Sequence, residues 1–127
     1  IIKSWDMLIK KKDIDVDIYF GTGGAPEGVL AAAALQCIGG QIQTRLVIRN
    51  DDEKKRAENL GIKDLDKKYL INDLASGDIV FVATGVTEGT MVKGVKKLGN
   101  IYTAHSIVLR SDENTTQYIQ TQYPNIS

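Results

Sequence analysis

The sequence predicts an α/β fold in which helices cover a layered mixed sheet, and two features of its 127 residues indicate this class. First, β-prone runs alternate with helical patterns from residue 15 to residue 98. Second, two β-prone runs near the end of the chain are separated by a short polar turn, as in a hairpin. Alternation of this kind favours parallel strands and a hairpin adds an antiparallel one, so we expect a mixed sheet.

The strands are predicted from short runs of β-branched, aromatic and aliphatic residues. The run Ile79-Val80-Phe81-Val82-Ala83 is continuously apolar, which is typical of a strand buried on both faces of a parallel sheet. The last two runs flank the polar turn 111–114. The predicted strands are 15–20, 44–48, a short extended piece at 68–71, 79–83, 103–110 and 116–121.

Three helices are predicted from apolar periodicity and from residues that suit helix ends. The first follows Pro26, whose missing N–H costs nothing at the start of a helix, and it ends at Gly39-Gly40. Its small side chains allow close approach to a sheet, and its apolar stripe comprises Leu30, Ala31, Ala34, Leu35 and Ile38. The second ends before Gly61. The predicted helices are 27–38, 51–60 and 90–98.

The composition argues against nucleic acid and membranes as partners and indicates a reducing compartment. The 16 basic and 16 acidic side chains cancel, so no overall field favours nucleic acid or an anionic membrane. No apolar stretch reaches the ~18 residues of a membrane helix, and no signal-peptide pattern opens the chain. Cys37 is the only cysteine and forms no internal disulfide, so a cytoplasmic protein is expected. Because the chain starts with Ile1 rather than Met, we also expect upstream sequence.

Two glycine turns follow predicted strands, at the sheet edge where ligands bind in open α/β folds. The first glycine turn is 21–28 (GTGGAPEG) and the second is 84–89 (TGVTEG). The exposed amides and the positive end of the following helix suit a phosphate at either turn. Glu27, however, adds a negative charge where that anion would dock.

Glu27 has two interpretations. As a carboxylate in the first helical turn, it stabilises the helix dipole by roughly 0.3–1 kcal/mol. Alternatively, it binds Mg²⁺ or Mn²⁺, which prefer hard oxygen ligands and commonly bridge a carboxylate to a substrate phosphate. In the second interpretation, backbone amides of Gly23 or Gly24 still contact the anion.

A dinucleotide-binding unit is the alternative, because the chain runs strand, Gly-x-Gly, helix, strand, acidic residue. Gly21-Thr22-Gly23 matches the first two glycines of that motif, and Asp51 or Asp52 stands where a ribose-binding residue is expected. The third glycine position is Pro26. Glu27 would also lie beside the pyrophosphate with no cation between them.

Three other residues have ordinary structural interpretations. His105, the only histidine, has no cysteine or acidic neighbour at a spacing that marks a metal site, so we expect a packed or surface side chain. Cys37 is expected to be a small core residue. Arg110, at a strand end before Ser111, is expected to belong to a turn rather than to an anion site.

Several motifs resemble one known family. They are Gly23-Gly24-Ala25-Pro26-Glu27-Gly28 with AAAALQCIGGQIQTRL behind it, Ala83-Thr84-Gly85-Val86-Thr87, Lys93-Gly94-Val95, and Thr103-x-His105-Ser106-x-Val108-x-Arg110-Ser111. In order and spacing, over most of the chain, they resemble the class II fructose-1,6-bisphosphatases. Glu88 stands where an aspartate is more usual in this family.

The resemblance implies a metal-dependent sugar-phosphate phosphatase of gluconeogenesis with the layered inositol-phosphatase-like fold, a homo-oligomer as the whole enzyme. It also implies that Glu27 is a metal ligand, that Gly24 and Gly23 contact substrate, and that Mg²⁺ or Mn²⁺ activates a water that attacks the 1-phosphate of a sugar bisphosphate. The family's other metal carboxylates, its catalytic threonine and its Asp-Gly-Asp motif are absent from these residues. We therefore expect residues 1–127 to be a single carboxy-terminal α/β domain of a larger phosphatase, inactive alone, with no catalytic residue of its own.

Overall fold

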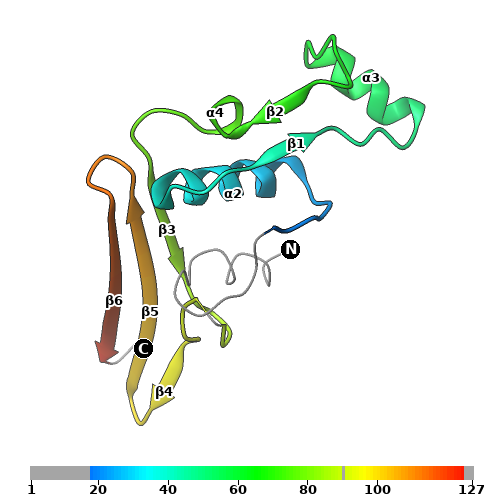
Figure 1. The fold of residues 1–127 in the computed structure, drawn as a ribbon. Coiled ribbons are helices and arrows are strands. Elements are labelled where there is room, and N and C mark those ends of the chain that lie inside the picture. The colour runs from blue at the N-terminus through cyan, green and yellow to red at the C-terminus, as the bar shows by residue number, and fades with distance from the viewer. Residues whose placement is uncertain (1–17, 90, 125–127) are drawn as a thin grey trace.

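The computed structural model describes residues 18–89 and 91–124. Its main sheet has four strands, and β5 (Ile101–Arg110) is the central one. Along one edge, β5 pairs over its full length with β6 (Thr115–Pro124); along the other edge it pairs first with β4 (Lys96–Leu98) and then with β3 (Val80–Thr84). All three pairings are antiparallel, and Figure 1 shows β6 on the outer side of the sheet.

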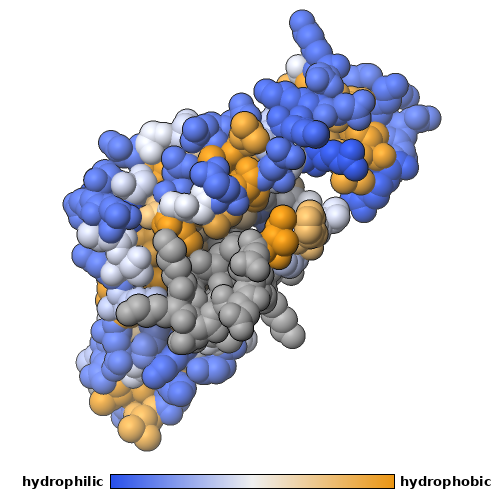
Figure 2. Space-filling model, in the orientation of Figure 1, coloured by the Kyte–Doolittle hydropathy of each residue, from blue (hydrophilic) through white to orange (hydrophobic). Residues whose placement is uncertain are grey.

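A second, two-stranded antiparallel sheet joins β1 (Gln43–Arg45) to β2 (Lys68–Leu70). Between these strands the chain forms α3 (Asp51–Asn59), and after them it forms the short helix α4 (Ile71–Leu74). These elements make an arm that extends from the main sheet and ends in α3 (Figure 1). In Figure 2 the end of the arm is mostly hydrophilic, as expected from the charged sequence of α3.

The core sits on the helix α2 (Ala25–Ile38), which packs on two sides. Ala34 and Cys37 are buried against Ile107 and Leu109 of β5, both fully buried. Ala32 and Leu35 pack against Ile71 of α4. The alanines bring the helix close to both neighbours, because a small side chain leaves room for close backbone approach.

Three local predictions are confirmed. The helix predicted at 27–38 is α2, which begins two residues earlier, at Ala25, and the hairpin is β5–β6 around the predicted turn 111–114. The helix predicted at 51–60 is α3, whose N-cap Asn50 accepts a hydrogen bond from the Glu53 N–H at 2.9 Å. In the predicted stripe of α2, Leu30 is 54% exposed, because the buried sides of the helix lie around Ala32 and Ala34.

The helix predicted at 90–98 is wrong. Residue 90 lies outside the described residues, residues 91–95 have no helical structure, and 96–98 form β4. The Val95 N–H donates to the Val86 carbonyl at 3.1 Å, and Lys96–Leu98 pairs with Thr103–Ile101 of β5. These tertiary hydrogen bonds use the backbone groups that a helix would need, so they override the local pattern.

Three predicted strands differ from the structure. Residues 15–17 lie outside the described residues, while 18–20 are exposed and form no strand. The strand predicted at 44–48 is shorter in the structure, where β1 ends at Arg45, because its partner β2 is only three residues long. The strand predicted at 79–83 is β3, but it pairs antiparallel, and its outer face is open, with Val80 and Val82 exposed.

The α/β class is confirmed, but the described strands pair only antiparallel, so the mixed sheet is not observed. The helix α2 packs on an antiparallel sheet and does not connect two parallel strands. None of the helices described by the structure is both long and apolar enough to cross a membrane.

Candidate functional site

The first glycine turn leads directly into α2, and its backbone is open. Gly24 is the N-cap, in extended conformation (φ −68°, ψ 156°), and its carbonyl accepts a 3.1 Å hydrogen bond from the Gly28 N–H. Among the described residues no side-chain hydrogen bond caps this end of the helix, and Pro26 has no N–H to satisfy. The positive end of α2 is therefore free to interact with a negative group.

Glu27 lies at this open end, in the first turn of α2. Its side chain is exposed, and among the described residues it has neither a hydrogen bond nor an ion pair. The carboxylate folds back over Gly24, because a Cβ added at Gly24 would collide with the Glu27 Oε2 atom. Glycine at position 24 thus leaves the space that the carboxylate occupies above the turn, while Gly23 is exposed beside it.

The second glycine turn is closed. The buried Gly85 and Gly94 lie at close backbone contacts: a Cβ on Gly85 would collide with the Lys93 carbonyl oxygen, and one on Gly94 would lie 2.6 Å from the Glu88 nitrogen. The Glu88 carboxylate accepts a hydrogen bond from the Gly94 N–H at 3.3 Å. The Gly85 N–H donates to the His105 carbonyl, and residues 91–95 form no helix, so the turn lacks the helix end on which the suggested anion site depended.

A hollow of about 500 Å³ lies beside the second glycine turn. His105 and Ser106 of β5 form part of its wall, and Tyr118 of β6 forms another part. His105 is half-buried, as expected for a packed histidine, and its Nδ1 atom is buried without a hydrogen-bond partner.

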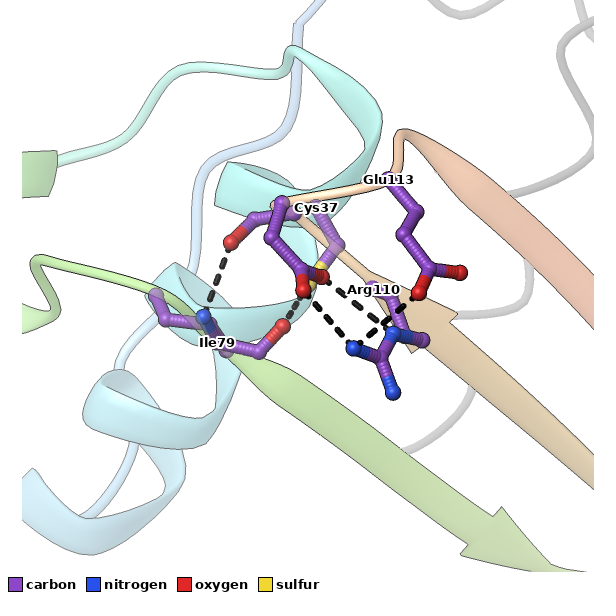
Figure 3. A network of polar contacts seen from close by, with 6 residues as sticks. Cys37, Ile79, Arg110 and Glu113 are labelled. Atoms are coloured by element: carbon purple, nitrogen blue, oxygen red, sulfur yellow. Dashed lines mark hydrogen bonds and ion pairs between the residues drawn. The ribbon is translucent and has the colours of Figure 1, made fainter.

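Arg110 is the last residue of β5, and its side chain binds residues of the β5–β6 turn (Figure 3). Its guanidinium donates to both oxygens of Asp112, at 3.2 and 2.7 Å, and pairs with Glu113 at 3.2 Å. The hydrogen bond to Asp112 raises the pKa of Arg110, and the same bond lowers the pKa of the Asp112 carboxyl. Both acidic partners of Arg110 lie in the turn, so these ion pairs stabilise the hairpin.

The neighbouring Ser111 has a structural role that the sequence did not reveal. Its Oγ accepts a hydrogen bond from the Ile79 N–H at 2.8 Å, and its own N–H donates to the Ile79 carbonyl at 3.0 Å (Figure 3). These bonds fix the start of β3 against the end of β5. The only sequence signal for them is a hydroxyl residue at the start of a turn.

Cys37 is a buried core residue, as predicted. Burial raises the pKa of its thiol, and its Sγ lies 3.6 Å from the Ile79 carbonyl (Figure 3). A thiol that is buried and kept protonated is a poor nucleophile. Cys37 therefore packs the core beneath the β5–β6 turn.

The dinucleotide alternative loses its structural basis. The strand that follows α2 is β1, and it pairs antiparallel with β2, whereas a dinucleotide unit requires parallel neighbours. Asp51 and Asp52 lie in the first turn of α3, on the arm (Figure 1). Acidic residues at this place stabilise the helix dipole.

Glu27 fits a divalent cation as one ligand within a larger set. Its carboxylate is exposed, and none of the described residues forms an ion pair or hydrogen bond with it. Carboxylate oxygen is also the kind of ligand that Mg²⁺ and Mn²⁺ prefer. Within residues 18–89 and 91–124, no three His, Cys, Asp or Glu side chains lie close enough together to hold a metal ion. A cation at this turn would therefore need further ligands besides those of the described residues.

Comparison with known proteins identifies the family. The family model described as "Bacterial fructose-1,6-bisphosphatase, glpX-encoded" matches residues 6–123. The "Fructose-1,6-bisphosphatase class 2" of Haemophilus influenzae is 39% identical over 122 residues, which cover 85% of this chain and 36% of the relative.

Two further relatives agree. The "D-fructose 1,6-bisphosphatase class 2/sedoheptulose 1,7-bisphosphatase" of Trichodesmium erythraeum is 34% identical over 120 residues (84% of this chain, 35% of the relative). The "Fructose-1,6-bisphosphatase 1 class 2" of Escherichia coli is 33% identical over 121 residues (85% and 36%). The chain spans about a third of the length of these relatives. It belongs to the bacterial, glpX-encoded fructose-1,6-bisphosphatase family.

Proposed function

We propose that this chain is part of a metal-dependent phosphatase that hydrolyses the 1-phosphate of fructose 1,6-bisphosphate, releasing fructose 6-phosphate and inorganic phosphate. The observation that carries this proposal is the family match over residues 6–123, together with relatives named for this activity. The relative from Trichodesmium erythraeum is also named for sedoheptulose 1,7-bisphosphate. We take the fructose bisphosphate as the substrate because all three relatives carry it in their names.

Within this phosphatase, the first glycine turn contributes one metal ligand and part of the phosphate site. Glu27 binds Mg²⁺ or Mn²⁺, and the backbone amides of Gly24 and Gly23 contact the substrate. The exposure of the Glu27 carboxylate, its lack of a partner among the described residues and its position above Gly24 support this role.

Charge explains why the cation is needed at this turn. The uncapped N-terminus of α2 attracts a phosphate, but the Glu27 carboxylate repels it. A divalent cation between the two anions makes both contacts favourable. When bound, such a cation lowers the pKa of a ligated water and neutralises charge on the phosphoryl oxygens. The part of Glu27 is to hold the cation, and that of the glycines is to let the substrate approach the backbone.

The chain provides one α/β domain of the cytoplasmic enzyme, residues 1–127, at its carboxy-terminal side. We assign it to the layered inositol-phosphatase-like fold, supported by the packing of α2 on the antiparallel sheet. The remaining carboxylate ligands and the groups that orient the water come from residues outside this chain.

The proposal is tested by measuring phosphate release from fructose 1,6-bisphosphate, with Mg²⁺, with Mn²⁺ and with a chelator. The full-length polypeptide is expected to release phosphate only with the metal, and the 127-residue chain alone is expected to be inactive. Metal-dependent release by the 127-residue chain would contradict the division of ligands. A full-length protein that releases no phosphate under any of these conditions would contradict the function itself.

A further inference from the structure

We infer that the rest of the same polypeptide packs on the main sheet, through the sheet face opposite α2, and that it does so with an apolar, uncharged helix. We call this face the outer face. Its large aliphatic side chains come from three neighbouring strands and are Val80 and Val82 of β3, Val108 of β5 and Ile119 of β6. The inference does not depend on the proposed activity.

The register of the sheet defines the outer face. Phe81 of β3 pairs with Leu109 of β5, and both pack in the core cluster that contains α2. Because successive side chains of a strand alternate, the neighbouring pair Val82 and Val108 points to the other face. Ile119 of β6 lies on this face too, since its partner on β5 is even-numbered, like Val108. Among the described helices, α2 is the one that packs on this sheet, so none of them covers the outer face.

The outer face has the composition of a buried surface. Val80 and Val82 are 56% and 58% exposed, and Ile119 is 43% exposed. An antiparallel sheet with one face in water usually alternates apolar and polar residues, whereas β3 is apolar on both faces from Val80 to Ala83. An exposed apolar patch that extends over neighbouring strands is typical of an interaction surface.

The polar groups of the outer face allow it to be buried. The hydroxyls of Thr84 and Ser106 lie 2.7 Å apart and share a hydrogen bond. The charged residues of this face lie only at its two ends: Arg110 is held by the acidic residues of the β5–β6 turn, and Lys97 lies over the Tyr102 ring at 5.1 Å. A layer that packs on the centre of the face therefore buries no charge, which would be costly.

The length of the relatives favours the same polypeptide as the partner. The chain spans about a third of their length, so about two thirds of such a polypeptide lies outside it. A covalently attached segment meets this face at a high effective concentration. In layered α/β folds, helices cover the faces of a sheet. The occupant is thus an apolar helix of that remainder, matched to a patch whose centre carries no charge.

Thiol labelling of the full-length polypeptide tests the inference. Val82→Cys places a thiol of similar size at the centre of the outer face, and Lys55→Cys is the control, at an exposed, charged position of α3. We expect the thiol at position 82 to react about 100-fold or more slowly than the thiol at position 55, and both to react equally fast in urea. The native Cys37 is buried, and the unsubstituted polypeptide gives the background rate.

Two labelling results would overturn the inference. One is an equal rate at positions 82 and 55 in the folded polypeptide, which would show that the outer face stays in water. The other is protection at position 82 that disappears when the protein is diluted, because a second copy would then cover the face.

A second variant gives a readout without labelling. Val82→Thr keeps the shape and the strand preference of valine, and its hydroxyl loses contact with water only if the outer face is covered. We expect this variant to lower the thermal unfolding midpoint of the full-length polypeptide by about 2 °C or more. An unchanged midpoint would contradict a covered face.

Discussion

The two glycine turns differ in their carboxylates: Glu27 of the first has no partner among the described residues, whereas Glu88 of the second accepts a hydrogen bond. At 21–28 the helix end is uncapped and Glu27 is exposed without a partner among the described residues. At 84–89 the carboxylate of Glu88 is bound by the Gly94 N–H, and Gly85 is buried against backbone. Both turns are rich in glycine and each carries a glutamate, so composition alone does not separate them.

The difference lies in what each glycine accommodates. At the second turn, a side chain on Gly85, or on Gly94 which packs against this turn, would collide with backbone, which has little freedom to move. In the first turn a side chain on Gly24 would meet only the far end of the Glu27 side chain, which can rotate. Glycine thus serves folding in one turn, and in the other it makes room for the carboxylate that we propose as a metal ligand.

The largest expected effect is on the free energy of unfolding, from a methyl group added to the glycine that packs against the second turn. Gly94→Ala places a Cβ 2.6 Å from the Thr87 carbonyl carbon and the Glu88 nitrogen, so we expect a loss of about 1–3 kcal/mol in the free energy of unfolding. Gly28→Ala is the matched control: it lies in α2 with nothing within 4 Å, and alanine there should stabilise by roughly 0.5–1 kcal/mol. Urea denaturation followed by circular dichroism measures both. Equal effects would remove the distinction between the turns.

A smaller effect is expected from the same change in the open turn. Gly24→Ala displaces the Glu27 carboxylate but meets no backbone, so the free energy of unfolding should fall by less than about 1 kcal/mol, the cost of alanine at an N-cap. In the full-length protein, if it is the phosphatase that we propose, the metal concentration for half-maximal activity should rise. A large loss of stability with unchanged metal activation would mean that Gly24 serves folding, like Gly94.

Local sequence signals predicted the elements whose contacts are local. Pro26 and Gly39 marked the ends of α2, and the polar turn between two β-prone runs marked the β5–β6 hairpin. The helix predicted at 90–98 failed because residues 96–98 pair with 101–103 in a hairpin and Gly94 packs against residues 87 and 88, contacts that the apolar pattern does not reveal. The apolar run at 79–83 did not reveal its pairing direction, since hydrophobicity alone does not distinguish a buried parallel strand from an antiparallel one.

The candidate site was predicted in part. The position of Glu27 in the first turn of a helix followed from Pro26 and the glycines before it. Metal binding by Glu27 is one of two interpretations of the residues, and the family resemblance favours it; it stays a prediction, because a carboxylate at a helix start also has a capping role. That the second turn is closed was not predictable, since the contacts of Gly85 with Lys93 arise only in the folded chain.

The most direct measurement compares metal activation of the full-length enzyme carrying Glu27→Gln with that of the enzyme carrying Glu88→Gln. Each change removes one carboxylate charge from a glycine turn and keeps the size of the side chain. Glu27→Gln is expected to lower turnover and raise the required Mg²⁺ or Mn²⁺ concentration by about tenfold or more. Glu88→Gln should leave the metal titration curve unchanged. Coincident curves for Glu27→Gln and the unsubstituted enzyme would contradict the account and leave Glu27 as a helix-capping residue.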